Sequence, residues 1–392
     1  MTEQPSASSN QLPAKSEQLS AISFQLLARI IAKATLLFLL LNLVFALTNP
    51  LSALGSLSVY NGLVPGRPRL PYGENPAQSY NLSTNNIPAM IATHTIRQPK
   101  ATDEYRILLI GDSSVWGWRL TNDQTLAAHL NATGLIVPDG RRAVIYNLGY
   151  PVMALMKDLL LLDAAMAYQP DAILWPLTLE SFARERQLFH PLVQNNTEHV
   201  QRLIADHSLL LDPSDPRLVN LDFFGRTLVG QRRELANWLR LQLYGASWAA
   251  TGIDQFIPVE FTPRSTDLEA DVTWQAFESP QSLTESDLAF DVLRAGISQV
   301  GNIPVLLVNE PIYISDGANS DIRYNAWYPR WAYDAYRALL ATTAESEGWD
   351  YLDLWDTVEG AQFTDSPVHM TPDATARTAA RIATWMQSFI EQ

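Results

Sequence analysis

A short apolar run that stops at a glycine most constrains how this chain can fold. The stretch Tyr105–Gly117 reads YRILLIGDSSVWG, and its apolar centre covers Ile107–Ile110. A run this short, rich in isoleucine and leucine and closed by Gly-Asp-Ser, predicts a buried parallel strand that ends in a tight turn. A helical pattern follows the turn. Ser113 is therefore predicted at the carboxyl end of a central strand, where open α/β sheets place their ligand sites.

The rest of the pattern alternates strands with helices. Strands are predicted in Ala143–Tyr150, with a turn at Gly149, and in Asp171–Leu177, Ile303–Pro311 and Asp350–Asp356, the last at a sheet edge. Helices are predicted in Met153–Tyr168, Ser286–Val300 with Ser286 as N-cap, Tyr333–Glu347 and Thr371–Glu391. This alternation predicts an α/β fold, a three-layer α/β/α doubly wound parallel sheet of flavodoxin-like type. The pattern loosens over residues 183–280, which predicts an inserted cap with a helix at Gln231–Gly245.

Composition limits the class of protein. A chain of 392 residues with 47% hydrophobic and 10% aromatic residues has enough apolar material for a core. The formal net charge of −14 argues against nucleic acid as a partner, and against an anionic membrane surface as a partner of the main domain. The absence of cysteine excludes disulfides, thiolate metal sites and cysteine nucleophiles. The six histidines form no His-x-x-x-His pair, so we expect no metal site and no cofactor.

The amino-terminal region predicts a single membrane span. Residues 1–24 are mostly polar and predict a disordered tail. Residues 25–48 form an apolar stretch about long enough to cross a bilayer, interrupted only by Arg29, Lys33 and Asn42. An amphipathic core helix and a cleaved signal peptide are the alternatives, and the long leader without a small-x-small site argues against cleavage.

The distribution of positive charge predicts the orientation of this span. Lys15, Arg29 and Lys33 all precede the most apolar part of the run. By the positive-inside rule the amino terminus is then cytoplasmic, the span is a signal anchor, and the rest of the chain lies outside the membrane. Residues 49–102, rich in Asn, Pro, Gly and Ser, are predicted to be a connector that partly packs against the domain.

Two motifs in this sequence resemble those of a known family. GDSSVWG resembles the first block of the SGNH (GDSL-type) hydrolases, which implies that Ser113 is a nucleophile. FTDSPVHMTPDATARTAARIA resembles the last block, in which Asp-x-x-His precedes the final helix, and its histidine maps onto His369. The resemblance covers about Tyr105–Gln392 and implies an SGNH-hydrolase-like domain over residues 103–392 in a membrane-anchored, bacterial-type member.

The chemistry of a serine nucleophile explains why these residue types belong together. A serine hydroxyl needs a base to remove its proton, and a carboxylate on the other ring nitrogen orients the imidazole. Asp365 is the candidate carboxylate. It lies four residues before His369, where the family pattern has three, and Ser366 occupies the expected position.

The two middle blocks of the family match less well. NLGYP matches the second block at Gly149, which implies that the N–H groups of Gly149 and Ser113 form an oxyanion hole. The third block normally supplies an asparagine donor, but Glu180 stands at that position. An ionised glutamate accepts hydrogen bonds and repels an oxyanion, so we expect Glu180 to be protonated, to bind a substrate hydroxyl, or to leave the third donor absent.

Further polar residues near predicted strand and helix ends are candidates for substrate binding. They are Asn309 and Glu310 after the fourth strand, and Asn325 and Tyr328 in an aromatic-rich patch that suits sugar rings but also suits plain packing.

The leading interpretation is a serine esterase of SGNH type outside the membrane, acting on O-acyl groups of carbohydrate or lipid, in the setting of envelope polysaccharide machinery. The alternatives are an O-acyltransferase on surface glycan and a catalytically weak glycan-binding or scaffold module. A nucleotide site is excluded because neither a Gly-x-Gly-x-x-Gly run nor a P-loop lysine is present.

Overall fold

The computed structural model describes residues 13–58, 61, 66–72, 86–251 and 260–390. Half of the predicted amino-terminal tail and parts of the predicted connector therefore lie outside the described residues. The chain divides into two units, one formed by Met1–Pro50 with Leu221–Leu235 and the other by Leu51–Asn220 with Ala236–Gln392.

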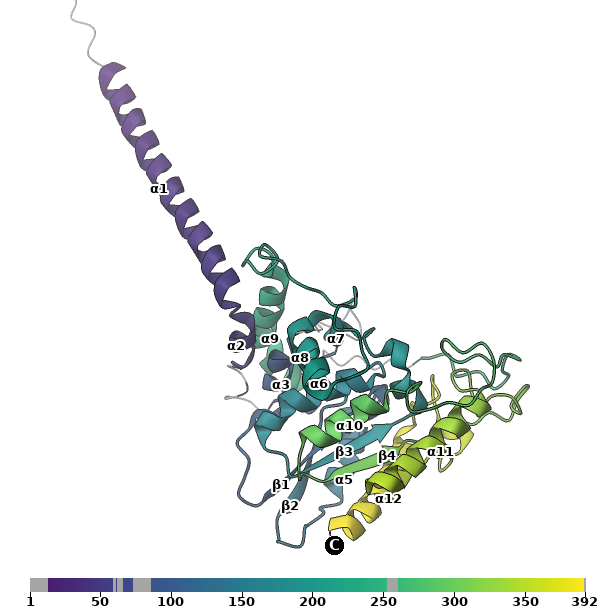
Figure 1. Ribbon diagram of the computed structural model, residues 1–392. Coiled ribbons are helices and arrows are strands. Elements are labelled where there is room, and N and C mark those ends of the chain that lie inside the picture. The colour runs from purple at the N-terminus through teal and green to yellow at the C-terminus, as the bar shows by residue number, and fades with distance from the viewer. Residues whose placement is uncertain (1–12, 59–60, 62–65, 73–85, 252–259, 391–392) are drawn as a thin grey trace, which may run out of the picture. The chain divides into compact units, whose positions relative to one another are not determined.

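The first unit contains the long helix α1, Pro13–Thr48 (Figure 1). Its stretch Phe24–Thr48, 25 residues, is long and apolar enough to cross a membrane. At 1.5 Å per residue it measures about 38 Å, against a hydrocarbon core of about 30 Å. The helix begins earlier than the sequence predicts: residues 13–24, assigned there to a disordered tail, are helical.

The second unit contains a five-stranded sheet in the order β2-β1-β3-β4-β5, with every pair parallel (Figure 1). Its strands are β1 Glu104–Leu109, β2 Arg142–Asn147, β3 Ala172–Leu177, β4 Val305–Asn309 and β5 Asp350–Asp353. All five lie within or next to the predicted strands, and β5 is the predicted edge strand. The strand β2 lies on one side of β1, and the chain then crosses to the other side of β1 to form β3. In open parallel sheets such a change in strand order opens a crevice at the carboxyl ends of the two strands where it occurs, here β1 and β3.

Helices cover both faces of the sheet. They are α5 Leu126–Ala132 and α12 Pro372–Ile390 on one face, and α6 Leu155–Ala165, α10 Phe290–Gln299 and α11 Arg330–Glu347 on the other. Alternate residues of a strand serve the two layers: Leu108 of β1 joins the α6 and α10 side, whereas Ile107 and Leu109 join the α5 and α12 side. The predicted three-layer α/β/α fold is confirmed.

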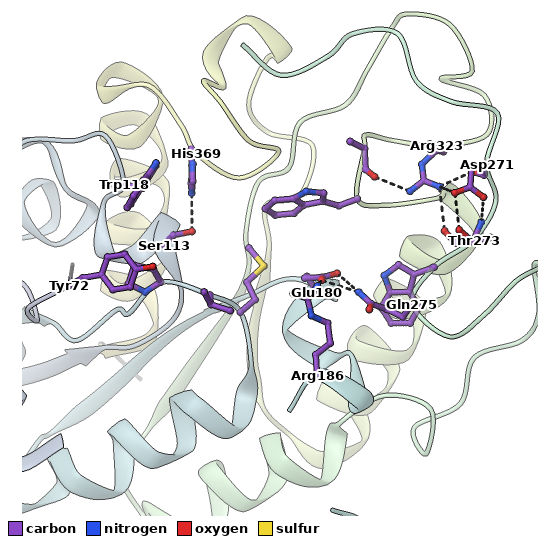
Figure 2. Close-up of a pocket in the computed structure, with 16 residues that line it drawn as sticks. Tyr72, Ser113, Trp118, Glu180, Arg186, Asp271, Thr273, Gln275, Arg323 and His369 are labelled. Carbon is purple, nitrogen blue, oxygen red and sulfur yellow. Dashed lines mark hydrogen bonds and ion pairs between the residues drawn. The ribbon is translucent and has the colours of Figure 1, made fainter. Parts of the chain in front are cut away.

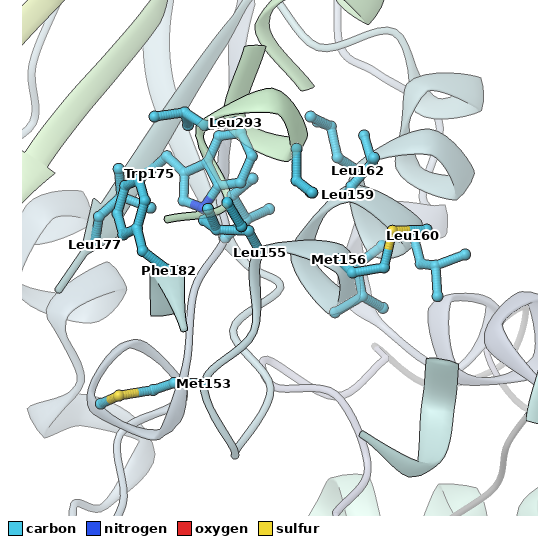
Figure 3. Close-up of a cluster of buried hydrophobic side chains, with 14 of the residues drawn as sticks. Met153, Leu155, Met156, Leu159, Leu160, Leu162, Trp175, Leu177, Phe182 and Leu293 are labelled. Atoms are coloured by element: carbon cyan, nitrogen blue, oxygen red, sulfur yellow. The ribbon is translucent and has the colours of Figure 1, made fainter. Parts of the chain in front are cut away.

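The larger core cluster lies between β3, α6 and α10 (Figure 3). Trp175 of β3 is fully buried there, and its ring leaves no room for a side chain on Gly296 of α10, where an added Cβ would come within 2.7 Å of the indole. Gly296 therefore lets α10 approach the sheet closely.

The remaining helices lie before the sheet or in the predicted insertion. They are α2 Leu51–Gly55, α3 Ile87–Ala92, α7 Pro191–Asn195, α8 Thr197–His207 and α9 Arg232–Thr251. Ile87, Met90 and Ile91 of α3 belong to the larger core, so this part of the predicted connector packs as a piece of the domain. The predicted N-cap Ser286 is wrong: α10 begins later, with Ala289 as N-cap.

Candidate active site

The strand-to-helix turn after β1 presents Ser113. Gly111 has φ of +148°, and a Cβ there would lie 2.7 Å from Val115, so the turn requires glycine. Asp112 caps the short helix α4, Ser113–Trp116, by accepting from Ser114 N–H at 2.7 Å. Ser113 is thus the first residue of a helix, and its N–H has no acceptor within that helix.

A chain of hydrogen bonds joins the three residues predicted to act together. Ser113 Oγ lies 2.8 Å from His369 Nε2, and His369 Nδ1 lies 2.8 Å from Asp365 Oδ1. These residues are 256 and four positions apart in the sequence. The structure therefore joins Ser113, His369 and Asp365 in one chain of hydrogen bonds, in that order.

The extra residue between Asp365 and His369 is accommodated by a serine turn. Ser366 Oγ accepts from His369 N–H at 3.2 Å and from Val368 N–H at 3.3 Å. Thr364 N–H donates to His369 O at 2.8 Å and closes the loop. These hydrogen bonds fold the loop between Asp365 and His369, so that the Asp365 carboxylate still reaches His369 Nδ1.

Asp365 is held as a carboxylate by its neighbours. Burial by itself would raise its pKa, but the hydrogen bond and charge of His369 outweigh burial and lower the pKa to about 2. Trp118 Nε1 donates to the other carboxylate oxygen at 3.2 Å, and the Trp118 ring lies 6.1 Å from the His369 ring. Trp118 was not predicted, although it lies two residues beyond the GDSSVW motif.

Gly149 contacts the turn that carries Ser113, but in a different role from the predicted one. Its N–H donates to Asn147 Oδ1 at 3.0 Å, so the structure does not support Gly149 as an oxyanion donor in this conformation. An added Cβ would lie 2.6 Å from Trp116 N and 2.9 Å from Val115 C. Gly149 therefore lets the loop after β2 pack directly on the backbone of α4.

The loop that follows Gly149 is pinned from behind and strained at its tip. Lys157 Nζ donates to Tyr150 O at 2.7 Å, and His190 Nε2 donates to Pro151 O at 2.9 Å. Burial lowers the pKa of His190 to about 3, which keeps the ring neutral. Val152 has φ of +72°, a costly conformation for a β-branched residue, and it lines the cavity beside Ser113.

Ser113 and His369 lie in the wall of a cavity of about 630 Å³. Figure 2 shows them toward one end, with Glu180, Gln275 and Arg186 farther along the cavity and Arg323, Asp271 and Thr273 beyond. Aromatic rings form much of the wall. The lining rings are Tyr72, Trp118, Trp274 and Trp327.

Glu180 lines this cavity and is already paired. Arg186 forms an ion pair with its carboxylate, and Gln275 Nε2 donates to both carboxylate oxygens at 2.9 Å. Burial raises the pKa of Glu180, against the opposing effect of the Arg186 charge. The sequence did not predict Arg186 and Gln275 as cavity residues, because both belong to the cap, whose hydrophobic pattern has no regular period.

Four predicted substrate-binding residues are placed elsewhere. Asn309 bonds to Asp353, Tyr333 and Tyr336, while Asn325 bonds to Tyr313 O and to the N–H groups of Trp327 and Tyr328. Tyr328 is fully buried and accepts from Thr178 Oγ1, and Glu310 is buried behind Ser114. None of the four is among the described residues that line the cavity, so the structure does not bring them to it.

A buried charged cluster lies directly behind the turn that carries Ser113. Lys157 Nζ donates to Gly111 O at 2.7 Å and pairs with Asp158 Oδ1 at 2.7 Å. Ser114 Oγ donates to Glu310 Oε2. Burial and the neighbouring Asp112 charge raise the pKa of Glu310 well above its ordinary value. The sequence signal for this cluster was a Lys-Asp pair inside an apolar helix.

The raised pKa of Glu310 predicts a pH-dependent loss of stability. Above pH 4.5 the unfolded carboxyl ionises while the folded one keeps its proton, so the folded state loses about 1.4 kcal/mol per pH unit until the folded group also ionises. Glu310→Gln mimics the protonated form and removes this dependence of stability on pH. We expect the Tm of wild type to fall relative to that of Glu310→Gln as pH rises from the acid range toward neutrality, in thermal scans.

Glu345→Gln, on the exposed part of α11, is the matched control and should follow wild type at every pH. A constant difference between wild type and Glu310→Gln across the scans would contradict a buried, protonated Glu310.

Comparison with known proteins gave matches only among solved structures. No family model and no curated protein matches the chain. A carbohydrate acetylesterase family member from Sinorhizobium meliloti matches with 11% identity and a TM-score of 0.33, covering 74% of this chain and 100% of that one. The native M. smegmatis aryl esterase matches with 11% identity and a TM-score of 0.32, covering 72% and 98%.

A gut microbial diltiazem-metabolizing enzyme matches with 10% identity and a TM-score of 0.35, covering 74% of this chain and 48% of that one.

Proposed function

We propose that this protein is a serine esterase. The observation that carries the proposal is the hydrogen-bonded chain from Ser113 through His369 to Asp365 in the wall of a cavity. Ser113 Oγ attacks the ester carbonyl carbon and its proton passes to His369 Nε2. The tetrahedral intermediate then expels the alcohol, which takes that proton, and leaves an acyl-serine. Water, deprotonated by the same histidine, releases the acid.

The N–H of Ser113 is the candidate donor to the oxyanion. It is the first N–H of α4, where helix geometry leaves the group without an internal acceptor and the positive end of the peptide dipoles favours an anion. Glu180 has no part in this stabilisation, because its carboxylate is engaged by Arg186 and Gln275.

The cavity favours an acylated carbohydrate as substrate. Its volume of about 630 Å³ exceeds what a small acyl group needs, and Trp274 and Trp327 line it together with the polar side chains of Glu180 and Gln275. Mixed aromatic and polar walls of this kind suit a ligand that presents both C–H faces and hydroxyl groups. Transfer to a sugar hydroxyl in place of water would use the same acyl-serine.

The helix α1 is proposed to anchor the enzyme in a membrane. Support comes from the apolar length of Phe24–Thr48 and from Arg29 and Lys33 near its amino-terminal end. Under the positive-inside rule the amino terminus is cytoplasmic and the esterase domain lies outside, where it meets envelope glycans.

A fluorophosphonate probe tests the nucleophile. We expect one covalent adduct on wild type, located at Ser113 by mass spectrometry of the digested protein, because only a serine with an adjacent base reacts readily. Ser113→Ala should lose the adduct.

The neighbouring Ser114 provides a matched control, since its hydroxyl is bonded to Glu310 rather than to an imidazole. Ser114→Ala should still be labelled. A folded wild-type protein that takes no label would overturn the esterase proposal and favour a glycan-binding module.

A further inference from the structure

One polar side chain in the apolar part of α1 is bonded to a distant segment of the same unit. Asn42 is 8% exposed, whereas Leu41 and Leu43 beside it are 50% and 45% exposed. Asn42 Nδ2 donates to Phe38 O at 2.9 Å within the helix, and Asn42 Oδ1 accepts from Val229 N–H at 3.1 Å. The segment 221–235, which contains Val229 and belongs to the α1 unit, therefore meets α1 at the level of Asn42.

The position of Asn42 along α1 gives the depth of this contact. Asn42 lies six residues before Thr48, or about 9 Å along the helix axis. If the 38 Å stretch is centred on a hydrocarbon core of about 30 Å, Asn42 lies about 5 Å inside the core boundary. An amide oxygen at that depth has no water partner, and the N–H of Val229 supplies the missing donor.

Apolar side chains cover the outside of the 221–235 segment. Leu221, Phe223 and Val229 are 44%, 49% and 44% exposed, and Phe224 is 77% exposed. The rings of Phe223 and Phe224 pack edge to face at 5.9 Å. Such a cluster is unfavourable in water but suits the boundary between acyl chains and headgroups.

The charges of the segment agree with a membrane contact. It contains Arg226, Arg232 and Arg233 against Asp222 and Glu234, a local balance of +1 in a chain of net charge −14. Arginine beside exposed aromatic and aliphatic residues is typical of membrane-interface segments, in which the guanidinium groups bind lipid phosphates.

We propose that the 221–235 segment is a second membrane contact that inserts Phe223 and Phe224 into the acyl-headgroup boundary beside α1. The inference rests on the proposed anchoring of α1 in a bilayer. The partner of the segment is lipid. A single membrane-spanning helix can rotate about its own axis, and the second contact limits that rotation for the α1 unit.

The cysteine-free chain allows a direct depth measurement. Single cysteines replace Phe224, Leu37 in the apolar part of α1, and the exposed Ser279 of the second unit, each in the full chain reconstituted in lipid nanodiscs. Each cysteine carries an environment-sensitive fluorophore, and lipids carry a doxyl quencher either near the headgroup or near the end of the acyl chain. Leu221→Cys is a second probe of the segment in case Phe224→Cys disturbs the ring pair.

We expect shallow-doxyl lipids to quench the Phe224→Cys and Leu221→Cys fluorophores at least about twofold more strongly than the Ser279→Cys fluorophore, with blue-shifted emission. Leu37→Cys should be quenched best by the deep doxyl group. Quenching of Leu37→Cys with water-like emission from both segment probes would overturn the inference while leaving the anchor intact, and would point to a protein partner for the segment. Water-like emission from Leu37→Cys would overturn both, without bearing on the serine chemistry.

Discussion

Replacing His369 by alanine is expected to lower kcat for a chromogenic acetate ester by on the order of 10⁴-fold or more, with a much smaller change in KM. The Ser113 proton then has no acceptor at the 2.8 Å position that Nε2 occupies. The ester still enters the cavity, because His369 is one of 16 lining residues and its removal enlarges the space. The remaining rate would come from binding and from the oxyanion contact alone.

A second histidine–carboxylate pair gives the matched control. His199 Nε2 lies 2.5 Å from Asp163 Oδ2, and neither residue lines the cavity. His199→Ala removes an imidazole paired with a carboxylate but leaves Ser113 its base, so its kcat should stay close to that of wild type. The measurement is the steady-state kcat of both variants, each checked for folding by circular dichroism. A His369→Ala enzyme that keeps most of the wild-type kcat would exclude His369 as the general base.

The fold was predictable because its signals are local. Each strand is a short apolar run bounded by polar or turn residues, and the parallel order follows from the helical pattern between runs. In β1, Leu108 points toward one helical layer and Ile107 toward the other, so both faces of the strand are covered. The continuous apolar run of this strand already predicts burial on both faces.

The motifs predicted that Ser113, His369 and Asp365 lie together, but they did not predict how the spacing between Asp365 and His369 is accommodated. Ser113 begins α4 directly after the turn that follows β1, and His369 lies in the loop before α12. The position of Asp365 depends on the bonds of Ser366 Oγ within the loop, and no periodic pattern encodes such bonds. The chemistry of the serine required a carboxylate nearby, and the structure places Asp365 within hydrogen-bond distance of His369 despite the extra residue.

Residues at strand ends were the least predictable, because a polar side chain there can face either the cavity or the core. Glu180 lines the cavity, whereas Asn309 and Glu310 do not. Whether such a side chain reaches the cavity depends on which residues pack against the end of its strand. Tyr333 and Tyr336 of α11 reach Asn309, and Ser114 of α4 reaches Glu310, through contacts between elements far apart in the chain.

The buried Lys157–Asp158 pair gives the largest expected effect on stability. Lys157 is fully buried, and its ammonium group pairs with Asp158 and donates to Gly111 O and Tyr150 O, each at 2.7 Å. Replacing Lys157 by methionine keeps the length of the side chain but leaves a buried carboxylate without its cation and removes a donor from two carbonyls. Breaking a buried pair in this way costs about 3–5 kcal/mol.

We therefore expect Lys157→Met to lower the free energy of unfolding by about 3–5 kcal/mol in urea titrations of the full chain in detergent, followed by tryptophan fluorescence. Lys100→Met is the matched control. Lys100 also pairs with an aspartate, Asp171, but with both side chains partly in solvent, so its loss should cost at most about 1 kcal/mol. In the double variant Lys157→Met, Asp158→Asn no buried charge is left unpaired, while the amide oxygen can still accept from Trp175 Nε1. That variant should recover part of the loss. If Lys157→Met were no less stable than Lys100→Met, the ammonium group would not neutralise a buried carboxylate, and the turn that carries Ser113 would be held by its backbone bonds alone.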